Sequence, residues 1–115
     1  MKLKTSNIIL YCKRWKDTVA FYRDTLKFPV NFSNEWFVEF VLTDKARLSV
    51  ADEEKSSIKS CRGKGITISL EIDEITTMYS SMEKAGLNPT PIKKIWGSKL
   101  FYICDPEGSR VEFWS

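Results

Sequence analysis

The sequence predicts an α+β fold made of two tandem βαβββ modules, with module one at about residues 1–58 and module two at about 59–115. Three observations predict this fold. The same order of strand-like and helix-like segments occurs twice, with a period of about 58 residues. One polar, linker-like segment, 52–65, separates the two copies. With 115 residues, 43% of them hydrophobic, the chain is long and apolar enough to form one compact domain.

In module one, the apolar, β-branched run 7–12 predicts the first strand. Residues 15–26 predict a helix because their large apolar side chains recur at i, i+4, i+7 and i+11. A second strand is expected at 28–33. Residues 35–42 and 46–51 predict a hairpin whose turn lies at 43–45.

Module two repeats this order. The alternating run 66–72 predicts a strand, and a helical stripe follows, with Asp73 as its expected N-cap and Gly86 as its expected C-cap. Further strands are expected at 90–96, 100–104 and 110–114, with a turn at 105–108 that closes the last hairpin.

Each helix must cover one face of its sheet, so alternate residues of every strand point to the opposite face. A two-residue turn at Asp44-Lys45 would pair Phe40 with Ser49. In the last hairpin, a three-residue loop with a left-handed Gly108 would pair Tyr102 with Glu112. We expect the two sheets to form a cup-shaped mixed sheet with the helices on its convex face. The expected concave face carries Asn7, Ile9, Tyr11, Trp36, Val38, Phe40, Arg47, Ser49, Thr67, Ser69, Glu71, Tyr102, Arg110, Glu112 and Trp114.

The composition excludes several classes of function. The chain contains no histidine, so Ser-His-Asp, Cys-His and His-based zinc chemistry are excluded. The net charge of +3 is spread along the chain, which does not favour a nucleic-acid-binding stripe or a polybasic membrane patch. No apolar run approaches the roughly 20 residues that a membrane span requires. The three cysteines have irregular spacing and indicate a reducing, cytoplasmic location.

Three features together resemble the vicinal oxygen chelate superfamily, which includes glyoxalase I, extradiol dioxygenases, fosfomycin-resistance enzymes and bleomycin-resistance proteins. They are the segment FYICDPEGSRVEFW at 101–114, the segment WKDTVAFYRDTLKF at 15–28, and the doubled βαβββ order. The resemblance covers essentially the whole chain. It implies a single glyoxalase/bleomycin-resistance-like domain over residues 1–115 and a homodimer.

Metal-dependent members of this superfamily place one ligand on the first strand and one on the last strand of each module. The resemblance assigns these positions to Asn7, Ser49, Thr67 and Glu112. Only Glu112 matches the usual set of histidine, glutamine and carboxylate ligands, and hydroxyls are poor ligands for a transition-metal ion. We therefore expect no metal and no cofactor, with Asn7, Ser49 and Thr67 as vestigial ligand positions.

The leading hypothesis is a metal-free protein that binds and sequesters a small aromatic or cationic molecule, in the manner of the bleomycin-resistance proteins that the chain resembles. The expected ligand-binding residues are Tyr11, Trp36, Val38, Phe40, Arg47, Trp96, Tyr102, Glu112 and Trp114. The alternative is a lyase or transferase of the same superfamily with an atypical site around Glu112. It would use either an unusual metal site at Glu112 and Asn7 or Glu112 and Tyr102 as a catalytic acid/base pair. A structural reading also stays open, in which Glu112 pairs with Arg47 or Arg110, and Trp36 and Trp114 lie in a dimer interface.

Overall fold

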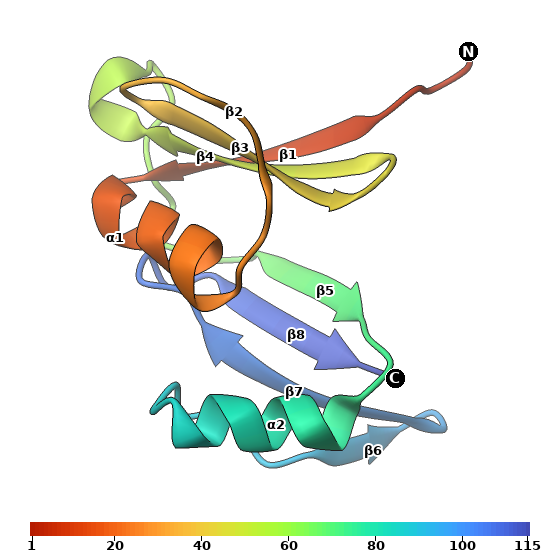
Figure 1. The fold of residues 1–115 in the computed structure, drawn as a ribbon. Helices are drawn as coiled ribbons and strands as arrows, with labels where there is room; N and C mark the ends of the chain where they lie inside the picture. Colours follow the sequence, from red (N-terminus) through yellow and green to blue (C-terminus); the bar gives the residue numbers. More distant parts are fainter. The chain divides into compact units, whose positions relative to one another are not determined.

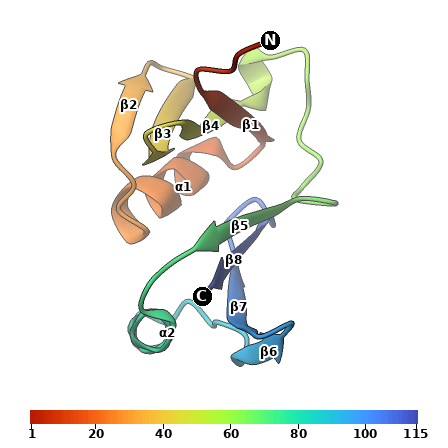
Figure 2. The same ribbon diagram turned by 90° about the vertical axis from the view of Figure 1, so that its right-hand side faces the viewer.

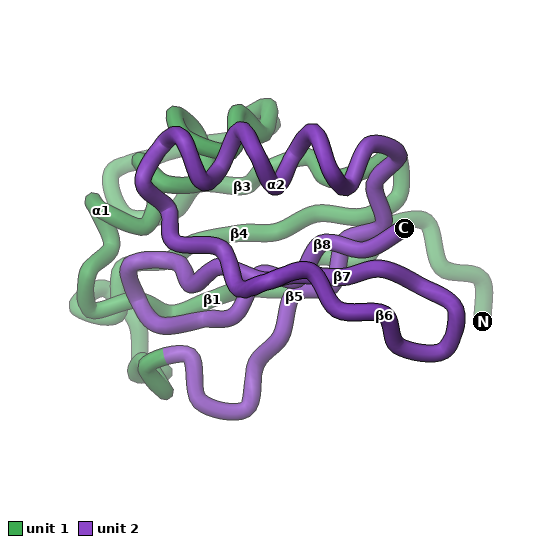
Figure 3. Tube along the Cα trace, turned by 90° about the horizontal axis from the view of Figure 1, so that it is seen from below, with its two compact units in different colours: residues 1–62 green, residues 63–115 purple.

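The computed structural model describes residues 1–115 and contains two compact units, Met1–Arg62 and Gly63–Ser115 (Figure 3). Each unit holds one four-stranded sheet with both parallel and antiparallel strands, together with helical segments. The predicted α+β class and the two tandem βαβββ modules are therefore confirmed. The two units divide between residues 62 and 63. The sequence predicts this boundary slightly earlier, at about residue 58.

The first unit has its strands in the order β1-β4-β3-β2, with β1 parallel to β4 and the other pairs antiparallel. The α1 helix packs on β4 and β1 (Figure 1). The elements are β1 (Ser6–Cys12), α1 (Trp15–Ala20), the π-helical turn η1 (Phe21–Thr25), β2 (Val30–Ser33), β3 (Phe37–Thr43), β4 (Ala46–Asp52) and the short 3-10 turn η2 (Glu53–Lys55).

The helix expected at 15–26 is an α-helix that widens into a π-helical turn. The Leu26 N–H donates to the Phe21 carbonyl at 2.9 Å, an i to i+5 bond. This turn places Tyr22 in the core, where it is fully buried and its ring lies 6.0 Å from the rings of Phe28 and Phe40. Lys27 follows with φ 63° and ends the helical segment.

The second unit repeats the topology with the strand order β5-β8-β7-β6, in which β5 is parallel to β8. Figure 2 shows its strands and helix from a second direction. None of its helices or those of the first unit, the longest of which has 10 residues, could cross a lipid bilayer. The elements are β5 (Thr67–Glu71), α2 (Ile75–Lys84), β6 (Lys93–Ile95), β7 (Ser98–Cys104) and β8 (Arg110–Trp114).

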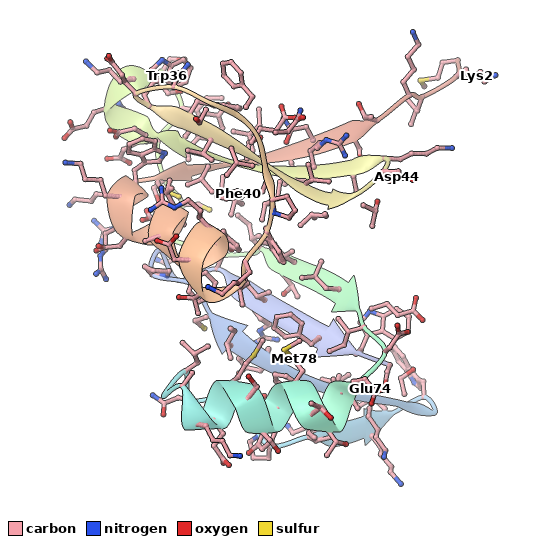
Figure 4. All side chains as sticks on the ribbon, viewed as in Figure 1. Lys2, Trp36, Phe40, Asp44, Glu74 and Met78 are labelled. Atoms are coloured by element: carbon pink, nitrogen blue, oxygen red, sulfur yellow. The ribbon has the colours of Figure 1, made fainter.

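The α2 helix ends at the glycine that the sequence indicates, but it does not begin at the predicted cap. Gly86 has φ 76°, and the Leu87 N–H donates to the Met82 carbonyl at 3.1 Å, which is the Schellman arrangement. The N-cap is Glu74, without a side-chain hydrogen bond, so the prediction of Asp73 is wrong. Figure 4 shows Met78 pointing from α2 toward the strands of its unit.

Tyr79 on α2 makes stability sensitive to alkaline pH. Its hydroxyl donates to Glu83 Oε2 at 3.3 Å, and its ring meets Phe101 edge-on at 5.5 Å between centroids. Partial burial, followed by the charge of Glu83 and this hydrogen bond, raises the pKa of Tyr79. The folded protein therefore holds the phenolic proton more tightly than the unfolded chain.

Stability from this raised pKa is fully present below the ordinary tyrosine pKa and is lost as pH rises through the folded-state value. We expect Tyr79→Phe to show a shallower decline in the free energy of unfolding than the parent protein above about pH 10. Urea denaturation at about pH 8 and about pH 10.5 measures this difference. Parallel declines in both proteins would contradict the assignment.

Candidate functional site

In each unit one face of the sheet packs on the helix, and the other, here called the helix-distal face, carries most of the polar side chains. The register decides which residues share this face, since directly paired residues point the same way. In the second unit β8 is central, with Glu112 paired to Ser69 on β5 and to Tyr102 on β7. The helix-distal face of the second unit comprises Thr67, Ser69, Glu71, Leu100, Tyr102, Cys104, Arg110, Glu112 and Trp114.

Tyr102 is held in place by its neighbours on both its backbone and its ring. Its N–H donates to Thr90 Oγ1 at 2.9 Å, and its carbonyl accepts from the Thr90 N–H at 3.0 Å. The Arg110 guanidinium carbon lies 4.1 Å from the centroid of the Tyr102 ring, a cation–π contact. The ring thus keeps a fixed position beside Glu112.

Trp114 is anchored on both sides although it is the penultimate residue. Its carbonyl accepts from the Ile72 N–H at 2.8 Å, and Ser115 exchanges two backbone hydrogen bonds of 3.0 Å with Lys99. Glu71 lies directly across from Trp114 in the parallel pair. The indole is half-buried, so it offers part of its surface next to a carboxylate.

Glu112 pairs with neither of the arginines expected as partners. Its carboxylate accepts a 3.4 Å hydrogen bond from Ser69 Oγ and forms no ion pair. Arg47 instead pairs with Glu39, and Arg110 lies on Tyr102. The structural reading in which Arg110 neutralises Glu112 is therefore wrong, and Arg47 already has a carboxylate partner within its own unit.

The helix-distal face of the first unit carries two sets of polar side-chain contacts. The Ser49 hydroxyl donates to Asn7 Oδ1 at 2.8 Å. Arg47 Nε lies 3.6 Å from a Glu39 carboxylate oxygen that also accepts from Asn31 Nδ2 at 2.7 Å. Arg47 also donates to two carbonyls of the β3–β4 turn, that of Thr43 at 2.6 Å and that of Asp44 at 3.2 Å. Arg47 is thus already occupied in stabilising its own hairpin. This face comprises Asn7, Ile9, Tyr11, Phe37, Glu39, Val41, Arg47, Ser49 and Ala51.

Val38 and Phe40 do not lie on the helix-distal face, contrary to prediction. The strands β3 and β4 shift register between Val41 and Thr43, so Phe40 pairs with Leu48 instead of Ser49. One extra residue in a strand reverses the facing of every residue beyond it. Val38 and Phe40 therefore face α1, and Phe40 is fully buried against Tyr22. Figure 4 shows Phe40 on the α1 side of its strands.

Two predicted aromatic residues lie in turns outside the strands. Trp36 precedes β3, where its N–H donates to Asn34 Oδ1 at 2.9 Å and its ring contacts Phe37 edge-on at 5.6 Å. Trp96 and Gly97 form the two-residue turn between β6 and β7, with φ of 50° and 79°. The Trp96 side chain is fully exposed, so it adds no enclosed surface to the sheet.

The four positions that correspond to the superfamily's metal ligands do not form a suitable donor set. Asn7 Oδ1 already accepts the Ser49 proton, and Ser49 is fully buried. Thr67 lies directly across from the cation Arg110, and Glu112 is the one carboxylate among the four. No group of three or more His, Cys, Asp or Glu side chains is placed to hold an ion. These residues do not fit a divalent transition-metal ion.

Glu39 also lies on the helix-distal face of the first unit, across from Ser49, although it is not among the residues that the sequence predicts there. It lies within Val38-Glu39-Phe40, the same three residue types as Val111-Glu112-Phe113 in β8. A carboxylate between two core residues marks the helix-distal face in both strands. Applied to β3, this signal would have placed Glu39 correctly and Phe40 in the core.

Comparison with known proteins agrees with this architecture. A family model described as the Glyoxalase/Bleomycin resistance protein/Dioxygenase superfamily matches residues 5–113. The uncharacterized protein YraH of Bacillus subtilis (strain 168) is 21% identical, over 97% of this chain and 98% of its own.

Two solved structures share the fold at low sequence identity. A lactoylglutathione lyase from Agrobacterium tumefaciens is 21% identical with a TM-score of 0.79, covering 94% of this chain and 90% of its own. TnmS3, an antibiotic binding protein from Streptomyces sp. CB03234, is 12% identical with a TM-score of 0.77, covering 98% of this chain and 93% of its own. At these identities the likeness shows a shared fold.

Proposed function

The chain belongs to the glyoxalase/bleomycin resistance protein/dioxygenase superfamily, and from this premise we propose that it is a metal-free protein that binds and sequesters a small planar molecule. The binding surface is the helix-distal face of the second unit, centred on Tyr102, Glu112 and Trp114. The ligand is aromatic or cationic. A homodimer and a cytoplasmic location belong to the same proposal.

The observation that carries this proposal is the combination of fixed aromatic rings and an unpaired carboxylate on one sheet face. Tyr102 and Glu112 are direct cross-strand partners, and Trp114 lies two residues beyond Glu112 on the same side of β8. All three side chains are half-buried, so each keeps surface for contact. Aromatic faces beside a carboxylate are suited to planar cations.

Binding without chemistry is supported by two further points. The residues at the metal-ligand positions do not form a donor set for a transition-metal ion, whereas binding requires no such set. TnmS3 shares the fold and is described as an antibiotic binding protein. The same fold therefore occurs in a protein that is described by what it binds.

An enzyme remains the second candidate, because Glu112 and Tyr102 are paired directly across β8 and β7. A carboxylate and a phenol on directly paired residues could serve as base and acid in a lyase or transferase reaction. The lactoylglutathione lyase of Agrobacterium tumefaciens has the same fold. Isomerisation of the hemithioacetal of glutathione and a 2-oxoaldehyde to the 2-hydroxyacyl thioester, lost on Tyr102→Phe with binding retained, would favour this alternative.

The proposal is tested by calorimetric titration with 9-aminoacridine, a planar cation, and with naphthalene-2-sulfonate, a planar anion. We expect 9-aminoacridine to bind and Glu112→Gln to weaken its affinity by about two- to thirtyfold, the range of one cation–aromatic or charge contact. Trp114→Leu should weaken it similarly. Metal content measured on the same samples separates binding from metal-dependent chemistry.

Trp96→Leu is the matched control, since it removes the same side chain from a fully exposed turn of the same unit. We expect it to leave the affinity unchanged. A loss of affinity from Trp96→Leu with none from Trp114→Leu would move the binding surface to the β6–β7 turn. No heat of binding with either probe, at concentrations up to the solubility limit, would contradict the proposed function.

A further inference from the structure

The charges on the helix-distal face of the second unit have opposite signs at its two ends. Arg110 is the first residue of β8, and Glu112 and Trp114 follow on the same side of that strand. At about 3.3 Å per residue, the backbone of Glu112 lies about 7 Å and that of Trp114 about 13 Å along β8 from the backbone of Arg110. Glu71 lies across from Trp114, at the negative end.

The positive end has hydrogen-bond donors that the protein does not use. Arg110 is exposed and its guanidinium rests on the Tyr102 ring at 4.1 Å, but it forms no ion pair with a carboxylate. A guanidinium carries five N–H donors, which match a carboxylate or similar anion in a bidentate arrangement. The cation–π contact orients these donors before any ligand arrives.

The negative end likewise has an unsatisfied charge. Glu112 accepts only a long hydrogen bond from Ser69, at 3.4 Å, and Glu71 forms no ion pair. Both carboxylates lie next to Trp114, one across the strand pair and one two residues before it. An ammonium group placed against the indole would interact with both the ring and the carboxylates.

Resting on the proposed function, we infer that the ligand is dipolar: a planar molecule with an anionic group at Arg110 and a cationic group at Glu112 and Trp114. A ligand with only a positive charge would bring that charge close to Arg110. A ligand with only a negative charge would bring it close to Glu112. A planar zwitterion, with an anionic group for the Arg110 guanidinium and a cationic group for Glu112 and Trp114, satisfies both.

The test uses three matched probes: 4-(aminomethyl)benzoate as the zwitterion, benzylamine as the cation and benzoate as the anion. Binding is followed through the indole N–H resonance of Trp114 in ¹⁵N-labelled protein. We expect the zwitterion to bind about tenfold more tightly than either single-charge probe, as one additional charge-assisted contact predicts. In Arg110→Gln the zwitterion should bind no more tightly than benzylamine. In Glu112→Gln it should bind no more tightly than benzoate.

Lys99→Gln is the control for a general loss of positive charge. Lys99 lies three residues before Tyr102 on β7, so its side chain points to the opposite face of the sheet, away from the helix-distal face. We expect this variant to keep the tenfold preference. The backbone amide spectrum of each variant confirms that it is folded.

The outcomes separate this inference from the proposed function. Equal affinity for benzylamine and the zwitterion, or a preference that Arg110→Gln leaves intact, overturns the dipolar assignment. Binding of 9-aminoacridine with no response to the zwitterion overturns it as well, while sequestration stands. Failure of all probes, 9-aminoacridine included, overturns the proposed function and this inference with it.

Discussion

Phe40→Ala is expected to lower the free energy of unfolding by about 3–5 kcal/mol, the usual cost of removing a fully buried phenylalanine. The Phe40 side chain has no exposed surface, and its ring lies 6.0 Å from that of the equally buried Tyr22. Truncation leaves a cavity between β3 and the helical segment that a well-packed core cannot fill. Urea denaturation followed by circular dichroism measures the loss, as a lower midpoint with an unchanged slope.

Phe32→Ala serves as the matched control. Phe32 lies on the neighbouring strand β2, and its side chain is 52% exposed, so its truncation should cost less than about 1 kcal/mol. The pair also tests the register of the first hairpin. If Phe40→Ala left stability unchanged but weakened ligand binding, Phe40 would lie on the helix-distal face after all.

Gly63→Ala is expected to destabilise the second unit by about 2–5 kcal/mol, through left-handed backbone strain and a steric overlap together. Gly63 has φ +75°, and a Cβ atom there would overlap the backbone of Gly108 and Ser109. That backbone cannot retreat easily. Asp105 Oδ1 accepts from the Ser109 N–H at 2.8 Å, and the Asp105 N–H donates to the Ser109 carbonyl at 2.9 Å.

Gly65→Ala is the control that measures the cost of the left-handed backbone conformation without the steric overlap. Gly65 has almost the same backbone conformation, with φ +76°, and an added Cβ would meet no atom within 4 Å. We expect it to cost only about 1–2 kcal/mol, the left-handed penalty alone. Thermal and urea unfolding of both variants measure the difference. Equal costs for the two substitutions would show that Gly63 does not pack against the last hairpin's turn.

Much of the fold could be predicted because the signals are local. Alternation in β5 and β8 assigns their faces, and Gly86 ends α2 where the sequence indicates. The register of the last hairpin follows from its turn: Gly108 has φ 99°, and Tyr102 pairs with Glu112 as expected. A glycine in the left-handed region leaves one geometry for a turn of this length.

The first hairpin shows where local signals end. Its turn at Asp44-Lys45 is correct, but the irregularity between Val41 and Thr43 carries no glycine, proline or asparagine to announce it. The predicted Phe40–Ser49 pair is therefore one residue out of register, and the sequence predicts the wrong face for Val38 and Phe40. The irregularity is favoured because it buries both side chains against α1, a contact that no short window of sequence contains.

The order of residues already set the doubled βαβββ plan, the absence of histidine chemistry and the position of Glu112 on the polar side of its strand. These properties depend on composition and on periods of two to four residues, which every segment carries within itself. The choice of charge partners came from packing in three dimensions. Arg47 pairs with Glu39, Arg110 lies on the Tyr102 ring, and Glu112 accepts a hydrogen bond from Ser69. Such pairings join residues from different strands, and a one-residue shift in register is enough to exchange them.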